Sequence, residues 1–139
     1  PFSLLSLDID FFKSVNDSWG HLTGDTVLRT VASLIEKRTR NSDIVARTGG
    51  EEFIVLMPHT TLSDATHVAE SLRIGMETES FFSEDGTAFS VTLSAGVVCW
   101  TSDADRVQEM LSACDQLLYQ AKRAGRNQVV VSEISAEKS

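Results

Sequence analysis

The order of apolar and polar positions divides this chain of 139 residues into alternating strands and helices. Short apolar runs bounded by turn residues predict strands at 4–9, 43–47, 53–57 and 128–131. The segment 89–99 alternates apolar with polar or small residues, which predicts a half-buried strand broken near Gly96. Apolar residues at helical spacing predict three helices, which contain positions 27–35, 65–76 and 107–121.

Turn and capping residues indicate where these elements begin and end. The polar stretch 11–23 is predicted to be a loop, and 24–25 opens the first helix with an acid that suits the helix dipole. The glycine pair 49–50 lies between two strands and predicts a hairpin. Thr61 or Ser63 is the expected N-cap of the second helix.

The expected order of elements is β-α-β-β-α-β-α-β, and the first six match the split βαβ pattern of ferredoxin-like folds. We therefore expect an α+β, palm-like domain with a central antiparallel sheet flanked by helices. In this topology the first two strands are parallel and the third lies between them. Asp8, which ends the first strand, would then meet Glu51 at one edge of the sheet. The domain is expected to span 1–131, followed by a polar tail at 132–139 that frays.

Composition excludes several classes of function. The formal net charge of −8 argues against nonspecific binding to a nucleic-acid backbone, so no nucleic-acid partner is expected. An acidic domain can still bind a nucleotide if metal ions and a few cations meet the phosphates. No apolar run approaches the ~20 residues that span a bilayer, so no direct membrane contact is expected. Cys99 and Cys114 lack metal or redox spacing and are predicted to be core residues in a reducing compartment.

Two carboxylates at one strand end, beside a glycine turn, suit a divalent metal. Mg²⁺ prefers oxygen ligands and often takes one or two carboxylates together with substrate phosphates. Gly49 and Gly50 would let a substrate approach the backbone closely. The alternative is a plain hairpin with exposed acids, which a lone Gly-Gly turn would favour.

Several longer motifs bear on this choice. Four motifs follow one another along the chain: the block 8–21 with its continuation through Gly24-Asp25 and Leu28, then Arg47-Thr48-Gly49-Gly50-Glu51-Glu52-Phe53, the triplet 94–96 and the block 113–127. Together they resemble the GGDEF family, the diguanylate cyclases, over nearly the whole chain. The resemblance implies condensation of two GTP molecules into cyclic di-GMP with release of two pyrophosphates. It also implies that two domains face each other as a homodimer, each presenting one GTP.

The resemblance assigns roles to particular residues. It implies that Asp8 and Glu51 bind Mg²⁺, or Mn²⁺ in its place, through carboxylates, and that Ile9 does so through its carbonyl. Glu51 would also help deprotonate the 3′-hydroxyl, with Glu52 as a further catalytic residue. Asp10, or Glu52 as an alternative to its catalytic role, would hold the metal ligands in place without binding the metal.

The remaining assignments concern the nucleotide. Asn16 and Asp25 would recognise guanine, and His21 and Leu28 would be further substrate contacts. The phosphates would be held by the amides of Phe11 and Phe12 and by three cations, Lys13, Lys122 and Arg126. Each has a structural alternative when taken alone: a turn residue for Asn16, a structural hydrogen bond for His21, and a solvated basic surface for the cations.

A further short pattern precedes the second strand. Arg40-Asn41-Ser42-Asp43 is similar to the RxxD pattern with which many members of the family bind their own product. Arginine can donate two parallel hydrogen bonds to a guanine edge or a phosphate. The resemblance therefore implies product inhibition through Arg40 and Asp43. The alternative is a surface arginine and an acid at a strand start.

The chain also departs from the family pattern. The sequence opens almost inside its first strand, so we expect it to lack the family's usual leading helix with its Asp-x-Leu-Thr-Gly-Leu-like segment, as well as a sensor domain. We expect a cytoplasmic output domain of a longer membrane-bound or soluble sensor protein. Two other functions remain open: a catalytically weak module that binds GTP or cyclic di-GMP, and another palm-like nucleotidyl cyclase or polymerase.

Overall fold

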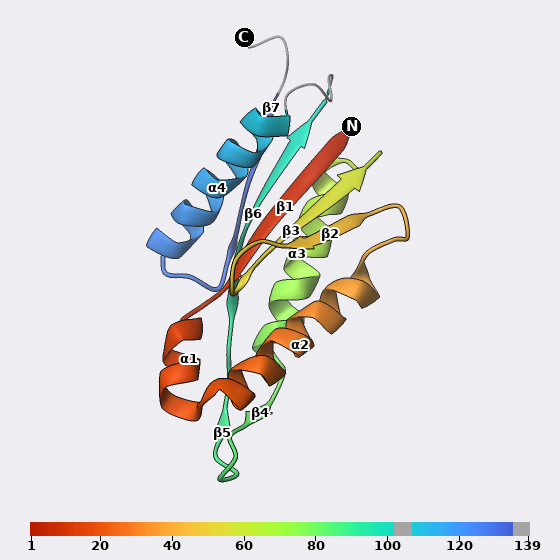
Figure 1. Ribbon diagram of the computed structural model, residues 1–139. Helices are drawn as coiled ribbons and strands as arrows, with labels where there is room; N and C mark the ends of the chain where they lie inside the picture. The colour runs from red at the N-terminus through yellow and green to blue at the C-terminus, as the bar shows by residue number, and fades with distance from the viewer. Residues whose placement is uncertain (102–106, 135–139) are drawn as a thin grey trace.

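The computed structural model describes residues 1–101 and 107–134 of the chain. The strands of these residues form one five-stranded sheet and a separate two-stranded hairpin, and four helices flank the sheet (Figure 1). In chain order the elements are β1 (Phe2–Ile9), α1 (Phe12–Trp19), α2 (His21–Arg38), β2 (Ile44–Arg47), β3 (Glu52–Pro58), α3 (Leu62–Glu77), β4 (Phe81–Phe82), β5 (Ala88–Phe89), β6 (Leu93–Trp100), α4 (Val107–Arg123) and β7 (Val129–Ile134).

The central sheet has the strand order β2-β3-β1-β6-β7. β3 pairs antiparallel with both β1 and β2, β6 pairs antiparallel with β1, and β7 is parallel to β6. β1 and β2 are therefore parallel with β3 between them, as the ferredoxin-like pattern predicts. The α+β, palm-like fold class is confirmed.

Helices cover both faces of the sheet. Leu5, Leu7 and Ile9 of β1 pack with residues of α2 and α3 on one face, while Leu4 packs with α4 on the other. This alternation follows from the period-2 geometry of a strand. No helix in the described ranges is long and apolar enough to cross a membrane.

β6 corrects one expectation. The alternating pattern predicts a half-buried strand broken near Gly96, but all eight residues of β6 are buried and the strand passes through Gly96 without a break. α3 and α4 cover its two faces, and a central strand between two helical layers needs no polar face. Small residues at alternate positions of this strand face a closely packed helix, not solvent.

The stretch 11–23 corrects another expectation, because it is largely helical. α1 occupies most of it and α2 already begins at His21, four residues before Asp25. Phe12 and Val15 are buried on one side of α1, while its other positions are mostly polar. Two apolar residues at helical spacing are too short a signal to distinguish an eight-residue helix from a polar loop.

Three smaller features complete the comparison with the sequence pattern. Thr61 is the N-cap of α3, and its hydroxyl accepts a hydrogen bond from the amide of Asp64 at 3.1 Å. The segment 83–86 is a turn, and it joins the short strands β4 and β5, which the pattern did not predict. β7 continues to Ile134, beyond the point at which the polar composition predicts that the chain frays.

Candidate active site

The end of β1 lies directly beside the glycine turn that joins β2 and β3. The amide of Ile9 donates to the carbonyl of Glu51 at 3.2 Å, and Asp8 stands opposite Glu52 in the β1–β3 register. The fold thus brings together Asp8, Ile9 and Glu51, which are far apart in sequence. This juxtaposition is the one that the strand order predicts.

Asp8 is a buried carboxylate at this sheet edge, with 6% of its surface exposed. Its Oδ2 forms an ion pair with the Nζ of Lys122, which reaches over from the last turn of α4. Its Oδ1 is buried and has no hydrogen-bond partner among the described residues. A buried carboxylate oxygen without a partner is costly, and a cation would satisfy it.

Glu51 and Glu52 add further negative charge around Asp8. Burial raises the pKa of Glu51, and the neighbouring Asp8 raises it further, while Lys122 opposes the shift. Burial also raises the pKa of Glu52, with Asp115 and Asp8 contributing in the same direction. The site therefore holds more carboxylate charge than Lys122 neutralises, which is the electrostatic setting of a divalent metal.

The residues present fit a divalent-metal site to which the protein would contribute only part of the ligands. Within residues 1–101 and 107–134 no three His, Cys, Asp or Glu side chains gather in a metal-binding group. A metal here would rest on Asp8, Glu51 and the carbonyl of Ile9, and would take its other ligands from phosphates and water. Mg²⁺ is commonly bound in that manner.

Asp10 lies beneath the site, and its carboxylate is directed into the protein and not toward solvent. Its Oδ1 accepts from the hydroxyl of Ser94 at 2.7 Å, and its Oδ2 accepts from the hydroxyl of Thr92 at 2.7 Å and the amide of Asn127 at 3.0 Å. Both oxygens are occupied, and the residue is 4% exposed. Asp10 ties the end of β1 to β6 and to the segment after α4, consistent with a supporting position.

The residues expected to bind phosphate gather around the start of α1. Phe11 stands at the N-cap position of α1 in a left-handed conformation, with φ 57°, and the residue is 63% exposed. The guanidinium of Arg126 lies 4.4 Å from the centroid of that ring. Phe12 is buried under the helix and Lys13 is exposed. Lys122, in contrast, forms an ion pair with Asp8, so its charge already balances that carboxylate.

The residues expected to recognise guanine lie at the α1–α2 junction. The side chain of Asn16 sits so close to Gly24 that a Cβ at Gly24 would lie 1.9 Å from the Asn16 Oδ1. Gly24 is therefore required for the position of Asn16. His21 and Asp25 are exposed on the first turns of α2, and Leu28 is partly buried against the core.

The chain matches the GGDEF domain of diguanylate cyclases over residues 1–128. It belongs to the GGDEF family. It is 43% identical over 137 residues to diguanylate cyclase A of Treponema denticola, covering 99% of this chain and 37% of that protein. It is also 43% identical over 131 residues to the response regulator PleD of Caulobacter vibrioides, covering 94% of this chain and 29% of that protein. The chain therefore spans about a third of the length of these relatives.

Solved structures show the same relationship for this GGDEF domain. The active GGEEF domain of a diguanylate cyclase from Vibrio cholerae is 37% identical, with a TM-score of 0.84 over 94% of this chain and 81% of that one. The GGDEF domain of DgcB from Caulobacter crescentus, in complex with c-di-GMP, is 33% identical, with a TM-score of 0.87 over 94% of this chain and 77% of that one. Residues 49–53 here also read GGEEF.

The GGEEF turn of this domain has open space beside its two glycines and is restrained by hydrogen bonds from Arg47. Gly49 has φ 87°, and nothing lies within 4 Å of a Cβ added at Gly49 or Gly50. Arg47 donates to the carbonyl of Gly50 through Nη2 at 2.7 Å and through Nε at 3.2 Å. The sequence pattern gave Arg47 no such role, although it stands in the signature. Open space over a restrained turn leaves room for a substrate.

The predicted inhibitory residues lie away from this turn, near the far end of β3. The backbone amide of Arg40 donates to Asp43 Oδ2 at 2.8 Å, and its Nη2 donates to Asp43 Oδ1 at 3.4 Å. The same nitrogen donates to the Pro58 carbonyl at 3.0 Å and to the hydroxyl of Thr60. Both residues line a pocket of about 380 Å³ whose other walls include Ile35, Val45 and Phe53.

Besides the role of Arg47, sequence reasoning missed four residues that shape the site. Thr92 and Ser94 hold Asp10, and Asn127 and Arg73 extend that network to α3. Ser94 and Asn127 stand inside family-like blocks, which was the available signal. Arg73 stands outside them, and only the three-dimensional structure shows that it reaches the site.

Proposed function

We propose that this GGDEF domain condenses two GTP molecules into cyclic di-GMP and two pyrophosphates, acting across the interface of a homodimer. The observation that carries the proposal is the proximity of Asp8 to Glu51 beside an open glycine turn, with an Asp8 Oδ1 that has no hydrogen-bond partner among the described residues. The named activities of its relatives support it.

The residues divide the work of the reaction. In each half, the 3′-oxygen of one GTP forms a bond to the α-phosphorus of the other, and the bond from that phosphorus to pyrophosphate breaks. Glu51 accepts the proton of the 3′-hydroxyl as the general base. A bound Mg²⁺ or Mn²⁺ would supply charge neutralisation on the phosphates.

Positioning supplies the rest of the catalysis, as is general in phosphoryl transfer. The amides of Phe11 and Phe12, with Lys13 and Arg126, hold the phosphates. Lys122 balances the charge of Asp8. With a metal held by Asp8, its ammonium group would be available to the phosphates. Asn16 and Asp25 select guanine, since adenine lacks the matching ring N–H and amino donors.

The decisive experiment is incubation of the domain, fused to a dimerising partner, with GTP and Mg²⁺, followed by mass analysis of the products. We expect cyclic di-GMP and pyrophosphate, and no cyclic product from ATP. Glu51→Gln should abolish the product while retaining most GTP affinity. Binding of GTP without any product in the wild-type chain would refute the cyclase and leave a nucleotide-sensing module.

We also propose that cyclic di-GMP inhibits the enzyme through Arg40 and Asp43. The pocket they line has apolar walls suited to a base, and the Arg40 side chain is 56% exposed at its rim. A guanine edge or phosphate would replace Asp43, Pro58 or Thr60 as acceptor for its guanidinium.

Arg40→Ala should weaken inhibition by cyclic di-GMP by about tenfold or more, because a charge-assisted hydrogen bond is lost. Inhibition constants from initial rates at several product concentrations provide the measurement. Arg38→Ala is the matched control, since Arg38 contacts Ser71 of α3 and lies outside the pocket lining. Equal inhibition of wild type and Arg40→Ala would show that this pocket does not bind the product.

The proposed setting of the domain follows from the same family relationship. We infer a cytoplasmic output domain that an upstream sensor or regulatory domain brings together as a homodimer. The structure of SiaD, a diguanylate cyclase of Pseudomonas aeruginosa 40% identical to this chain, in complex with its activator SiaC supports control by a protein partner.

A further inference from the structure

The segment 124–128 after α4 adopts an unusual backbone. Gly125, Arg126 and Asn127 all have positive φ, at 120°, 65° and 49°. Left-handed conformations are unfavourable for residues other than glycine, and two such residues in succession persist only where their surroundings hold them. Arg126, which the proposed function places on a phosphate, is one of the two.

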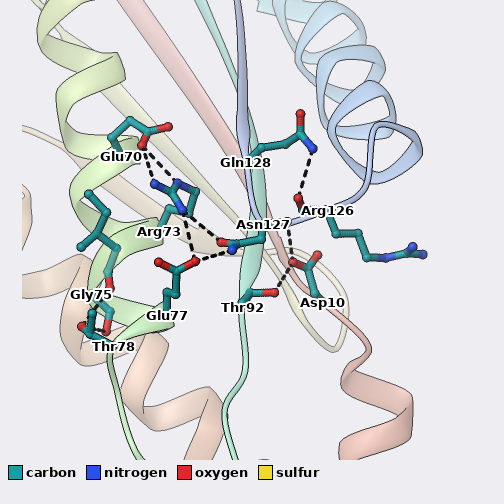
Figure 2. A network of polar contacts seen from close by, with 11 residues as sticks. Asp10, Glu70, Arg73, Gly75, Glu77, Thr78, Thr92, Arg126, Asn127 and Gln128 are labelled. Atoms are coloured by element: carbon teal, nitrogen blue, oxygen red, sulfur yellow. Dashed lines mark hydrogen bonds and ion pairs between the residues drawn. The ribbon is translucent and has the colours of Figure 1, made fainter.

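Asn127 is held from two directions (Figure 2). Its backbone amide donates to Asp10 Oδ2 at 3.0 Å, which ties it to the end of β1. Its side-chain oxygen accepts from Arg73 Nη1 at 3.2 Å, and its side-chain nitrogen donates to Glu77. Both side-chain partners belong to α3, so Asn127 joins α3 to the strand that carries Asp8.

Arg73 is itself fixed before it reaches Asn127. Its Nη2 lies 3.0 Å from Glu70 Oε2, its Nε donates to the same oxygen at 3.1 Å, and its Nη1 lies 3.6 Å from Glu77 Oε2. Only 19% of its side chain is exposed. A guanidinium clamped by two carboxylates of its own helix presents its remaining N–H groups in one direction, here toward Asn127.

The geometry points to a positioning role: we propose that Arg73, through Asn127 and Asp10, fixes the left-handed segment 124–128 and so sets Arg126 against Phe11 for phosphate binding. The inference rests on the proposed function of Arg126. The guanidinium carbon of Arg126 lies 4.4 Å from the centroid of the Phe11 ring, which places the fixed segment beside the residue whose amide is expected to contact phosphate. Arg73 acts through Asn127 and is not a catalytic residue.

The first test needs no nucleotide. Hydrogen–deuterium exchange of the whole chain should show protected amides at 126–127, because Arg126 N donates to the Ala121 carbonyl and Asn127 N donates to Asp10. Arg73→Ala should raise exchange in 124–128 at least about tenfold and leave β6 unchanged. Arg38→Ala, which removes another arginine contact to α3, should leave 124–128 unchanged. Unchanged exchange in Arg73→Ala overturns the proposal.

The second test asks whether the segment acts on nucleotide through Arg126. Affinity for a non-hydrolysable GTP analogue with Mg²⁺ is measured for Arg73→Ala, Arg126→Ala and the double variant. We expect Arg73→Ala to weaken binding about tenfold, and to weaken it less than about twofold further when Arg126 is already alanine. Independent, multiplying losses would assign Arg73 a general structural role and overturn the proposal.

The two readouts separate failure of this proposal from failure of the proposed function. If the wild-type chain binds no GTP analogue, the cyclase proposal fails, and the exchange measurement alone decides whether Arg73 fixes the segment. If the analogue binds but Arg73→Ala changes neither exchange nor affinity, only the positioning role fails. Thermal unfolding of each variant shows whether a loss of affinity merely reflects loss of the folded state.

Discussion

At the scale of single residues, the site is defined by charge that the protein alone does not balance. Asp8 has one oxygen paired with Lys122 and another without a partner among the described residues, and Glu51 lies close enough to have its pKa raised by Asp8. Such an arrangement lowers the stability of the empty fold and favours a bound cation. Under the proposed function, these carboxylates serve a bound cation at some cost to the stability of the empty fold.

Asp8→Asn should remove the coupling between metal and nucleotide. We expect a non-hydrolysable GTP analogue to raise the melting temperature of the wild-type chain only when Mg²⁺ is present, by an amount that grows with analogue concentration. Asp8→Asn should lose most of that increase, measured against its own melting temperature. Asp17→Asn, an exposed acid on α1, is the control and should keep the increase. A full increase in Asp8→Asn would exclude Asp8 as a metal ligand.

Gly24→Ala tests the guanine site with little change in stability. Alanine favours a helix over glycine by about 1 kcal/mol, but the new Cβ would lie 1.9 Å from Asn16 Oδ1 and must displace that side chain. We expect affinity for the GTP analogue to fall about tenfold, while the free energy of unfolding stays within about 1 kcal/mol of wild type.

The control for Gly24→Ala is Gly75→Ala on α3. Its Cβ would meet the end of the flexible Arg38 side chain at 3.1 Å, and Gly75 lies away from the nucleotide residues. Gly75→Ala should leave affinity unchanged. Unaltered affinity in Gly24→Ala would show that Asn16 does not contact the base.

At the scale of elements, the close packing of α4 against β6 around Gly96, called here the β6–α4 seam, positions Lys122. α4 packs so closely on β6 that a Cβ at Gly96 would lie 2.6 Å from the carbonyl oxygen of Cys114 and 2.7 Å from the amide of Leu118. The Cys114 thiol donates to the Gly96 carbonyl at 3.2 Å, and burial raises its pKa to about 12. A close, apolar seam fixes the end of α4 over Asp8.

Gly96→Ala should destabilise the domain by about 1–3 kcal/mol, because the atoms that a methyl group would meet are helix backbone and cannot move away cheaply. Denaturant unfolding measures the change as a shift of the midpoint. Gly50→Ala is the matched control, since nothing lies within 4 Å of its added Cβ, and it should change stability by less than about 0.5 kcal/mol. Equal midpoints for both variants would show that the seam relaxes freely.

The elements also show what a sequence can and cannot predict. The apolar runs and turn signals were enough to predict the order of β1, β3 and β2. That order in turn predicts that Asp8 and Glu51 lie close together. The short helix α1 did not follow, because two buried residues give too weak a period. The burial of both faces of β6 depends on helices elsewhere in the chain. The contacts of Arg73 and Lys122 depend on partners 54 and 114 positions away, which local pattern does not encode.

At the scale of the whole molecule, one domain holds half of the proposed reaction. Cyclic di-GMP contains two phosphodiester linkages, and each proposed site supplies the base for only one of them. A symmetric pair of domains therefore completes the ring, and a single domain with one bound GTP does not. The net charge of −8 disfavours close approach of two copies, so metal and the bound nucleotides must enter the contact or an upstream domain must enforce it.

Mixing wild type with Glu51→Gln tests this division directly. In a mixed dimer the wild-type site can still deprotonate its own 3′-hydroxyl and form one linkage, while the variant site cannot close the ring. With random pairing at fixed total protein, an equimolar mixture should give about one quarter of the wild-type rate of cyclic di-GMP, because only wild-type pairs complete it. The linear dinucleotide that keeps one triphosphate should accumulate, and mass analysis detects both products. Mixing with Asp17→Asn should cause no loss, and a cyclic product that falls only in proportion to the wild-type fraction would mean that each domain closes the ring alone.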